Sequence, residues 1–461
     1  MKKLLLALSA AAICAPAFAT VDPATYAAAP NGLTCTSVWI KSRTHNLEEL
    51  QTTTGNFLLN NNKIRSTAVL NDMLIMGYSK PEVIDEKTYE HTYILIYDLM
   101  TGKFLKEVQV TVDGAPINGT LCINQVGVDD FGHLWFTGAN FDVNTKPVPV
   151  YYIADPNTGV ATKAFEYMLP SDEASAAARR VDYFDVVGDV TLQQSSASIL
   201  FAVANDDGCT VIGGTINQDK TWSNVMNDGD YAVGLIEETY PAGQTTWNGA
   251  PMVRIVRSED HTPELFYVDA FVTPPTLYNT SGSMLDSFEN CGDALADLAP
   301  KNNANGCVEF TLGGETYFVY ALSDYDQGGS RVNVAKMGEG DAFEGMQLLW
   351  TLPEKGLGEI SDTGSRMFGM NPVLKKDKSG KEAIYLPITK CNNGFGLYRI
   401  AQPGFNASDV ESSGVESVEM DDPNAPVEIF NLNGVRVSED NMAPGLYIKR
   451  QGTKATKMVV K

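Results

Sequence analysis

Short apolar runs separated by turn residues dominate the middle of this chain. Six of them are rich in β-branched or aromatic residues and are bounded by polar residues, Gly or Pro: 93–98 (Y-I-L-I-Y-D), 150–155, 198–204, 252–257, 316–322 and 383–388. Runs of this length and composition predict strands. The most helix-like segment, 173–180 (E-A-S-A-A-A-R-R), covers about two turns, so we expect it to be a short connector.

Two turn patterns recur between these runs. Asp98-Leu-Met-Thr-Gly102 and Asp155-Pro-Asn-Thr-Gly159 begin 57 residues apart, and each leads into a second polar-apolar strand. Asp and Gly at these positions favour a tight hairpin turn. The other pattern, a polar turn with Gly before an apolar strand, appears at 129–136 (D-D-F-G-H-L-W-F), 205–212 and 377–386.

A unit of short strands that repeats about every 40 to 60 residues is typical of a β-propeller. Residues 129–138 (D-D-F-G-H-L-W-F-T-G) also resemble the D-x-D-G-x-L-W-x-G-T motif of bacterial propeller repeats. The spacing of 57 residues divides 35–405 into about six blades. We therefore expect an all-β protein with a β-propeller of about six blades over residues 20–405. Seven blades, eight small blades or a pair of β-sandwiches are the alternatives.

The first residues have the pattern of a secretory signal peptide. Lys2 and Lys3 precede an apolar run, 4–15, and the small-residue segment Ala17-Phe18-Ala19. We expect cleavage after residue 19 and a secreted or outer-cell-surface protein, with the periplasm as the alternative. Ile13 before Cys14 disfavours lipid attachment. No apolar run reaches the ~20 residues of a spanning helix, so we expect no integral membrane segment.

The charge balance excludes one class of partner. The chain has 57 acidic and 34 basic residues, a formal net charge of -23. A polyanion of this size repels nucleic acid, so nucleic-acid binding is not expected. Beyond the signal peptide the cysteines number six, an even count that is compatible with disulfides in an exported protein. We considered the pairs Cys291–Cys307 and Cys35–Cys391, the second of which would join the first and last blades.

Familiar catalytic motifs are missing from the sequence. It contains no H-E-x-x-H, G-x-S-x-G, P-loop or S-x-D-x-G-x-x-W segment. Asp362-Thr-Gly364 matches the aspartic-protease triplet, but that mechanism needs two such loops, so a plain turn is favoured.

One segment has the spacing of a cation-binding loop. In Asp324-Tyr-Asp326-Gln-Gly328, alternate carboxylates precede a Gly, which makes Asp324 and Asp326 candidate calcium ligands. Position 12 of the loop is Ala335 rather than Glu, so a polar hairpin turn is favoured over calcium binding. No other cofactor is expected.

Three aromatic residues are candidates for ligand binding. Trp222 and Trp247 lie in polar segments, where an indole face could stack on a sugar ring, although each could instead cap the rim of a blade. The longest irregular stretch is 272–306, with Tyr278 near its tip, and we expect recognition there because propellers bind through their loops. Trp39, Trp135 and Trp350 lie in apolar strand patterns and are expected in the core.

The C-terminal region differs in charge from the rest. Residues 407–425 contain six acidic residues and no basic one, which indicates a linker over 406–425. Residues 426–461 carry six basic and three acidic residues, a net charge of +3. Asn433-Gly434 predicts a type I′ hairpin turn within them.

Residues 426–461 resemble the C-terminal sorting tail of proteins exported by the bacterial type IX secretion route. The matching segments are P-V-E-I-F-N-L-N-G-V-R-V, A-P-G-L-Y-I-K-R-Q and the terminal K-M-V-V-K. The resemblance implies a small β-sandwich-like module that contacts the export machinery and guides passage across the outer membrane. Tails of this family are usually longer and begin with a further strand pair, which the acidic linker replaces here. An ordinary C-terminal β-module is the alternative.

Two function classes follow from these observations. We expect an exported, non-catalytic binding protein that recognises a glycan or protein ligand through propeller loops. The alternative is a propeller-fold carbohydrate-active lyase or hydrolase. That alternative predicts at least two Asp or Glu side chains that converge with a Tyr or His at the axis of the ring.

Overall fold

The computed structural model describes the chain in the following ranges: residues 25–48, 64, 66–84, 86–117, 123–138, 148–167, 178–205, 208–216, 222–224, 238–239, 251–270, 273–292, 305–324, 329–358, 368–411, 427–431, 436–437, 445–451 and 454–460. All structural statements below refer to these residues.

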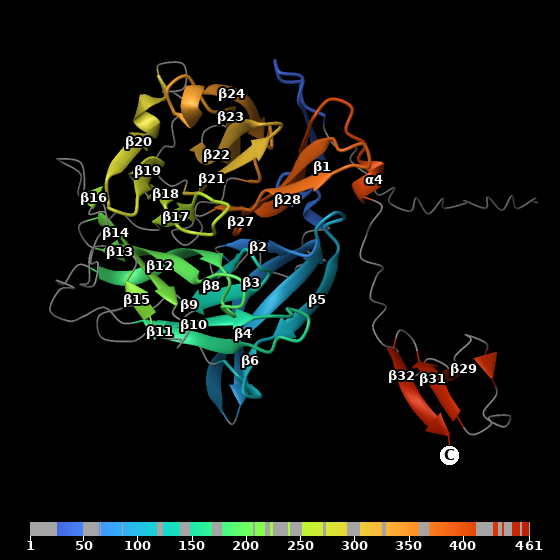
Figure 1. Ribbon diagram of the computed structural model, residues 1–461. Coiled ribbons are helices and arrows are strands. Elements are labelled where there is room, and N and C mark those ends of the chain that lie inside the picture. Colours follow the sequence, from blue (N-terminus) through green and yellow to red (C-terminus); the bar gives the residue numbers. More distant parts are fainter. Residues whose placement is uncertain are drawn as a thin grey trace, which may run out of the picture.

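Six antiparallel sheets form the blades of a β-propeller, as the sequence predicts (Figure 1). Blade 1 contains β2 (Thr67–Leu70), β3 (Met73–Ile84), β4 (Lys87–Asp98) and β5 (Phe104–Gln109). Blade 2 contains β8 (Ile123–Val128), β9 (Leu134–Gly138), β10 (Val148–Ile153) and β11 (Thr162–Tyr167). Blade 3 contains β12 (Ala178–Gly188), β13 (Ala197–Asn205), β14 (Gly208–Ile216), β15 (Trp222–Asn224) and the short β16 (Glu238–Thr239).

The remaining blades follow the same order. Blade 4 contains β17 (Met252–Ile255), β18 (Leu265–Asp269), β19 (Thr276–Asn279) and β20 (Met284–Ser287), followed by the short helix η1 (Phe288–Cys291). Blade 5 contains β21 (Cys307–Leu312), β22 (Glu315–Asp324), β23 (Gly329–Lys336) and β24 (Gln347–Leu352), with η3 (Glu339–Asp341) before β24. Blade 6 contains β25 (Phe368–Met370), β26 (Val373–Lys376), β27 (Glu382–Lys390), β28 (Gly394–Ala401) and the N-terminal strand β1 (Thr34–Ser42).

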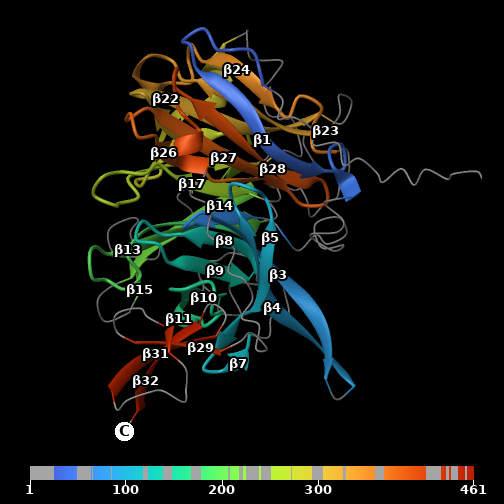
Figure 2. The ribbon, with the colours of Figure 1, turned by 90° about the vertical axis from the view of Figure 1, so that its right-hand side faces the viewer.

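Strand pairing closes the ring. β1 lies beside β28 as the outer strand of blade 6, so that one blade combines both ends of the propeller (Figure 2). Cys35 pairs in register with Ile400. Cys35, Cys291 and Cys307 are buried free thiols. The two disulfides considered from the sequence are therefore not formed, and backbone hydrogen bonds take the place of a covalent closure.

Apolar side chains fill the spaces between blades. Each of six buried clusters combines residues of two neighbouring blades around the ring. On β13, Ile199, Phe201 and Val203 pack against blade 2, whereas Leu200 and Ala202 pack against blade 4. Side chains of a strand alternate between faces, and both faces are covered here, which explains why the predicted strands are continuous apolar runs rather than alternating ones.

The recurring turns separate into two positions within a blade. The turns at Asp98 and Asp155 join the third and fourth strands of blades 1 and 2, so their spacing of 57 residues is the blade repeat. The turn at Asp129 joins the first and second strands of blade 2. In blade 6, β25 and β26 both pair with β27 as an interrupted first strand, and the turn at Asp377 joins β26 to β27. Asn205 instead ends β13, the second strand of blade 3, and lies on the other face of the ring. We call the face with the first-to-second-strand turns the turn face.

Three expectations from the sequence need correction. Residues 178–180 of the expected helical connector belong to β12. The stretch 272–306, expected to be irregular, contains β19, β20 and η1, because four-residue strands with polar members leave little periodicity. The packed body extends past residue 405: α4 (Ser408–Glu411) follows, and Val410 is buried against blades 6 and 1.

The C-terminal strands form a separate four-stranded sheet. It is composed of β29 (Val427–Asn431), β30 (Arg436–Val437), β31 (Gly445–Gln451) and β32 (Lys454–Val460) in the order β30-β29-β31-β32. A two-stranded sheet, β6 (Thr111–Val112) with β7 (Ala115–Pro116), flanks blade 1. Among the described residues, no helix has the length and apolar character needed to cross a membrane.

Candidate functional site

A buried arginine connects three blades at the centre of the ring. Arg254 lies on β17, the innermost strand of blade 4, and its Nη2 donates a hydrogen bond to the carbonyl oxygen of Met370 at 3.0 Å. Met370 belongs to blade 6, on the far side of blade 5. The guanidinium carbon of Arg254 also lies 5.0 Å from the ring centroid of Tyr183 on β12 of blade 3. The Arg254 side chain therefore lies at the axis, where the innermost strands converge.

Two carboxylates share the charge of Arg254. Burial alone would lower the pKa of the guanidinium, but Tyr183, Asp185 and Asp269 act in the opposite direction, and the pKa is raised. Asp185 belongs to β12 and Asp269 is the last residue of β18, and both side chains are buried. A charge taken out of water needs a countercharge nearby, so these three residues form one electrostatic unit, in which the carboxyl groups act by their charge and not through an ion pair. We call this unit, together with Tyr183, the axial cluster.

Asp269 has an unusual protonation equilibrium. Burial raises the pKa of its carboxyl to about 7, against the opposing effects of the Gly306 amide and Arg254. Its Oδ2 accepts a hydrogen bond of 2.6 Å from the Gly306 amide, while Oδ1 has no hydrogen-bond partner within the described ranges. Nε of Arg254 has none there either. A buried polar atom without a hydrogen-bond partner lowers the stability of the fold by about 1 to 3 kcal/mol, and a water or ligand group that bonded to either atom would remove this cost.

Tyr183 completes the axial cluster with a neutral phenol. Its side chain is fully enclosed, and burial raises the pKa of Tyr183 to about 12. Burial likewise raises the pKa of the nearby Cys307 thiol, and Asp269 adds to the shift. Both groups are uncharged at neutral pH, so the axial charge is confined to Arg254 and the two carboxyl groups.

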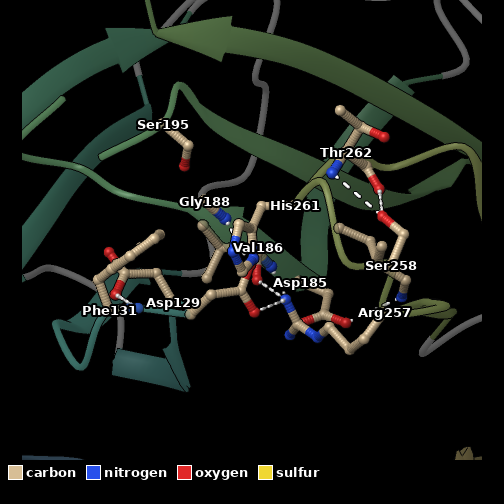
Figure 3. A network of polar contacts seen from close by, with 12 residues as sticks. Asp129, Phe131, Asp185, Val186, Gly188, Ser195, Arg257, Ser258, His261 and Thr262 are labelled. Atoms are coloured by element: carbon tan, nitrogen blue, oxygen red, sulfur yellow. Dashed lines mark hydrogen bonds and ion pairs between the residues drawn. The ribbon is translucent and has the colours of Figure 1, made fainter. Parts of the chain in front are cut away.

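Asp185 continues the polar contacts toward the turn face (Figure 3). Its carboxylate accepts hydrogen bonds from the Val186 and Ile255 amides and from Nη2 of Arg257, each at 2.9 Å. Arg257 also donates to the carbonyl oxygen of Val186 and lies 3.5 Å from a carboxylate oxygen of Asp130. The sign of the charge thus alternates from the turn face to the axis, from Asp130 through Arg257 and Asp185 to Arg254.

Asp130 ties together the turns of three blades. It lies in the β8–β9 turn of blade 2, and its Oδ2 accepts hydrogen bonds from the amide of Gly188 in blade 3 (2.8 Å) and from Nδ1 of His261 in blade 4 (3.0 Å). His261 adopts a left-handed backbone with φ of 60°. The ring of Phe131 lies 5.0 Å from the imidazole (Figure 3). We call Asp130, Phe131, Arg257 and His261 the turn-face network.

A second cluster has metal-ligand residue types but a structural role. Asp129, His133 and Asp189 place their side-chain donor atoms within 4.8 Å of one another. The Asp129 oxygens already accept N–H groups from Phe131, His133, Trp135 and Val190. The Asp189 oxygens accept the amides of Thr191, Gln193 and Gln194. With their lone pairs engaged, the carboxylates join blades 2 and 3 and are poor ligands for a cation.

The sequence-predicted ligand residues do not meet at one place. Tyr278 lies within β19, buried at 4% exposure, and its ring stacks on Phe266 with centroids 6.1 Å apart. The expectation that Tyr278 lies near the tip of an exposed loop is wrong, because that part of the chain is a blade strand. Trp222 begins β15, at the outer part of blade 3. Trp247 lies outside the described residues.

One of the two predicted calcium ligands, Asp324, ends a strand of a β-hairpin. Asp324 is the last residue of β22 and pairs with Gly329 of β23, so the hairpin interpretation of this segment is confirmed. Asp326 lies outside the described ranges, and calcium binding there stays a prediction.

The residues of the axial cluster were not singled out from the sequence. Arg254 lies in the run 252–257, which was used only to predict a strand, and Asp269 ends L-F-Y-V-D, which lies outside the predicted runs. A charged residue inside an apolar strand is itself a signal, because charged side chains are almost never fully buried without a partner. The partner could not be named, since Met370 is 116 residues from Arg254.

The whole chain was compared with known proteins. No protein-family model matches the chain, and no curated protein matches it. Solved structures similar to it include an α-L-arabinanase of Penicillium chrysogenum in complex with arabinobiose, with 11% identity and a TM-score of 0.42 over 76% of this chain and 96% of that one. A sialidase of Trypanosoma rangeli has 9% identity and a TM-score of 0.39 over 83% of this chain.

This chain spans 58% of the length of that sialidase. The polysaccharide lyase Uly1 has 10% identity and a TM-score of 0.33 over 73% of this chain and 89% of the lyase. The six-bladed architecture of the present chain is defined by its own strand pairing.

Proposed function

We propose that this protein hydrolyses neutral glycans at the axis of its propeller. The observation that carries the proposal is the convergence of Asp185, Asp269 and Tyr183 around Arg254, contributed by the inner strands of neighbouring blades. Two carboxyl groups with a Tyr at the axis are what the enzyme alternative predicts from the sequence, and for this reason we favour it over a non-catalytic binding protein.

The two carboxyl groups have the complementary environments that glycoside hydrolysis needs. One carboxyl must donate a proton to the leaving oxygen while the other is ionised and acts as base or nucleophile. Because burial raises the pKa of Asp269 to about 7, this group carries a proton at mildly acidic pH, which suits a general acid. Asp185 accepts three N–H donors and is the candidate for the ionised partner.

The charge of the chain supports a neutral substrate. At a formal net charge of -23, the protein repels polyanions such as polyuronates at long range. Arg254 could attract a single carboxylate, but its charge is already shared with Asp185 and Asp269. Hydroxyl groups of an uncharged sugar are therefore the fitting partners for Oδ1 of Asp269, which is buried and has no hydrogen-bond partner among the described residues.

A reducing-sugar assay on a panel of neutral polysaccharides tests this function. Asp269→Asn removes the proton donor and should lower kcat by a factor on the order of 10² to 10⁴. Asp113→Asn is the matched control: Asp113 is exposed in the β6–β7 turn with φ of 51°, a conformation that Asn tolerates. Loss of activity only in the Asp269 variant supports the proposal. A wild-type protein that binds a glycan without releasing reducing ends would overturn it in favour of a binding protein.

We also propose that the protein acts outside the cell. This part rests on the signal-peptide pattern of residues 1–19 and on the basic segment 426–461, whose strands β29 to β32 pair with one another. Fractionation of cells that express the full chain or a version truncated after residue 425 tests it. Equal surface delivery of both versions would exclude a sorting role for the tail.

A further inference from the structure

We propose that the turn-face network is a second, non-catalytic binding site for neutral sugar rings, formed by Phe131, His261 and Arg257. Blades 2 and 4 supply these three side chains, and their shared partners are Asp130 and the backbone of blade 3. This site shares the ligand class of the proposed function but does not depend on hydrolysis at the axis.

Two aromatic rings are presented at the surface of the turn face. Phe131 is 38% exposed, although it is a large apolar side chain, and the imidazole of His261 packs against it at an interplanar angle of 59°. The His261 side chain is 34% exposed. An exposed aromatic face beside polar groups favours contact with the apolar face of a sugar ring, whose hydroxyl groups then point to the rim.

Hydrogen-bonding groups surround these rings. Nδ1 of His261 is oriented by Asp130, which leaves Nε2 to accept a hydrogen bond from a hydroxyl group. The Arg257 side chain is 43% exposed, and its described contacts engage Nη1 and Nη2 on the side of Asp185 and Val186. Since a guanidinium has five N–H donors, the exposed side retains donors for ligand oxygens.

The surroundings hold the site rigid. His261 adopts φ of 60°, a value that few residues other than Gly adopt. It lies in the five-residue loop 258–262, which Ser258 stabilises: its Oγ accepts a hydrogen bond from the Thr262 amide and donates one to Asp260. The Asp130 amide and carboxylate bond reciprocally to the Gly188 backbone. Preorganised side chains lose little entropy on binding, which suits a site for a weak, neutral ligand.

The charges in the network favour an uncharged ligand over an anion. Arg257 contacts both Asp130 and Asp185, and His261 contacts Asp130. Two carboxylates thus face one arginine and one histidine, so the network has no net positive charge whether the histidine is neutral or protonated. A uronic acid would meet this negative charge, whereas a neutral pentose or hexose would not.

Affinity electrophoresis tests the site without turnover. The Asp269→Asn variant is run through gels that contain arabinan, laminarin, galactomannan or, as the anionic comparison, polygalacturonate. In this background, Phe131→Ala should raise the apparent dissociation constant for the retarding neutral polysaccharide about tenfold, and Phe131→Trp should restore retardation. Leu285→Ala, which truncates a 51% exposed apolar residue on β20, is the matched control and should leave retardation unchanged.

The outcomes separate this proposal from the proposed function. Retardation that depends on Phe131 supports the second site even if no polysaccharide is hydrolysed. Three results would overturn it: no retardation of the Asp269→Asn protein by any neutral polysaccharide, equal retardation with and without Phe131, or stronger retardation by polygalacturonate. Hydrolysis by the wild-type protein together with any of these results would leave the axial proposal standing alone.

Discussion

Nη2 of Arg254 donates a hydrogen bond to the carbonyl oxygen of Met370 and thereby joins the innermost strands of blades 4 and 6 past blade 5. The same guanidinium faces Tyr183 of blade 3. One buried cation thus contacts three of the six blades, whereas apolar clusters fill the spaces between neighbouring blades.

Arg254→Met should destabilise the propeller strongly. The substitution removes the hydrogen bond to the Met370 carbonyl and the positive charge near Asp269, whereas Asp185 keeps its ion pair with Arg257. Leaving a buried group without its partner costs about 1 to 3 kcal/mol. Urea denaturation measures the loss in the free energy of unfolding.

The same substitution in the Asp269→Asn background should cost less, because the carboxylate that loses its nearby positive charge is absent. The double-mutant cycle should give a coupling energy of about 0.5 to 3 kcal/mol. Strict additivity of the two single effects would show that Arg254 and Asp269 do not interact.

Asp269 should make the protein less stable as pH rises from about 4 to 7. Its pKa in the folded state is about 7, above the ordinary value of 3.8, so the folded protein binds more protons than the unfolded chain within this window. Stability falls with increasing pH wherever the folded state holds the extra proton. Thermal unfolding of wild type and Asp269→Asn across this range should show the wild type losing stability relative to the variant as pH rises.

Asp377 should behave with the opposite sign and serves as the comparison. The Asn406 amide, then the Ser379 hydroxyl, lower the pKa of its carboxyl to about 2. Its contribution to stability is present above about pH 4 and is lost as pH falls toward 2.

A constant difference between wild type and Asp269→Asn from pH 4 to 7 would contradict the assignment of a raised pKa to Asp269.

Much of the fold could be predicted because it repeats locally. Residues such as Ile199 and Leu200 are buried on opposite faces of one strand, which produces the apolar runs that identified the blades. The spacing between Asp98 and Asp155 gave the blade length directly. In blade 4 only β17 lies in a predicted run, because β19 and β20 are short and are stabilised by pairing, β19 with β18 and β20 with β19, rather than by their own composition.

The candidate site could not be predicted in the same way. Tyr278 is a candidate because it lies near the tip of the longest irregular stretch, 272–306, yet cross-strand pairing buries it. Arg254, Asp185 and Met370 are close only because the ring brings distant blades together. Arg254 and Met370, which share a hydrogen bond, are 116 positions apart in the sequence. Local pattern contains no information on which blades face one another across the axis.

Asp129→Ala should weaken the contact between blades 2 and 3. The carboxylate accepts the indole N–H of Trp135 at 3.0 Å and the Val190 amide of the next blade at 3.2 Å, in addition to donors of its own turn. Removing it strands buried donors, so the free energy of unfolding should fall by about 3 kcal/mol. Asp155→Ala is the matched control, because Asp155 accepts the exposed Asn157 amide in a surface turn and its loss should cost less than about 1 kcal/mol.

The same variants distinguish a structural carboxylate from a metal ligand. Because the oxygens of Asp129 are already engaged by N–H donors, EDTA should not change the thermal midpoint of the wild type, and added zinc should not raise it. Asp129→Asn, which keeps one acceptor oxygen, should retain part of the lost stability. A midpoint that falls with EDTA for the wild type but not for Asp129→Ala would show instead that Asp129 and its neighbours His133 and Asp189 hold a cation.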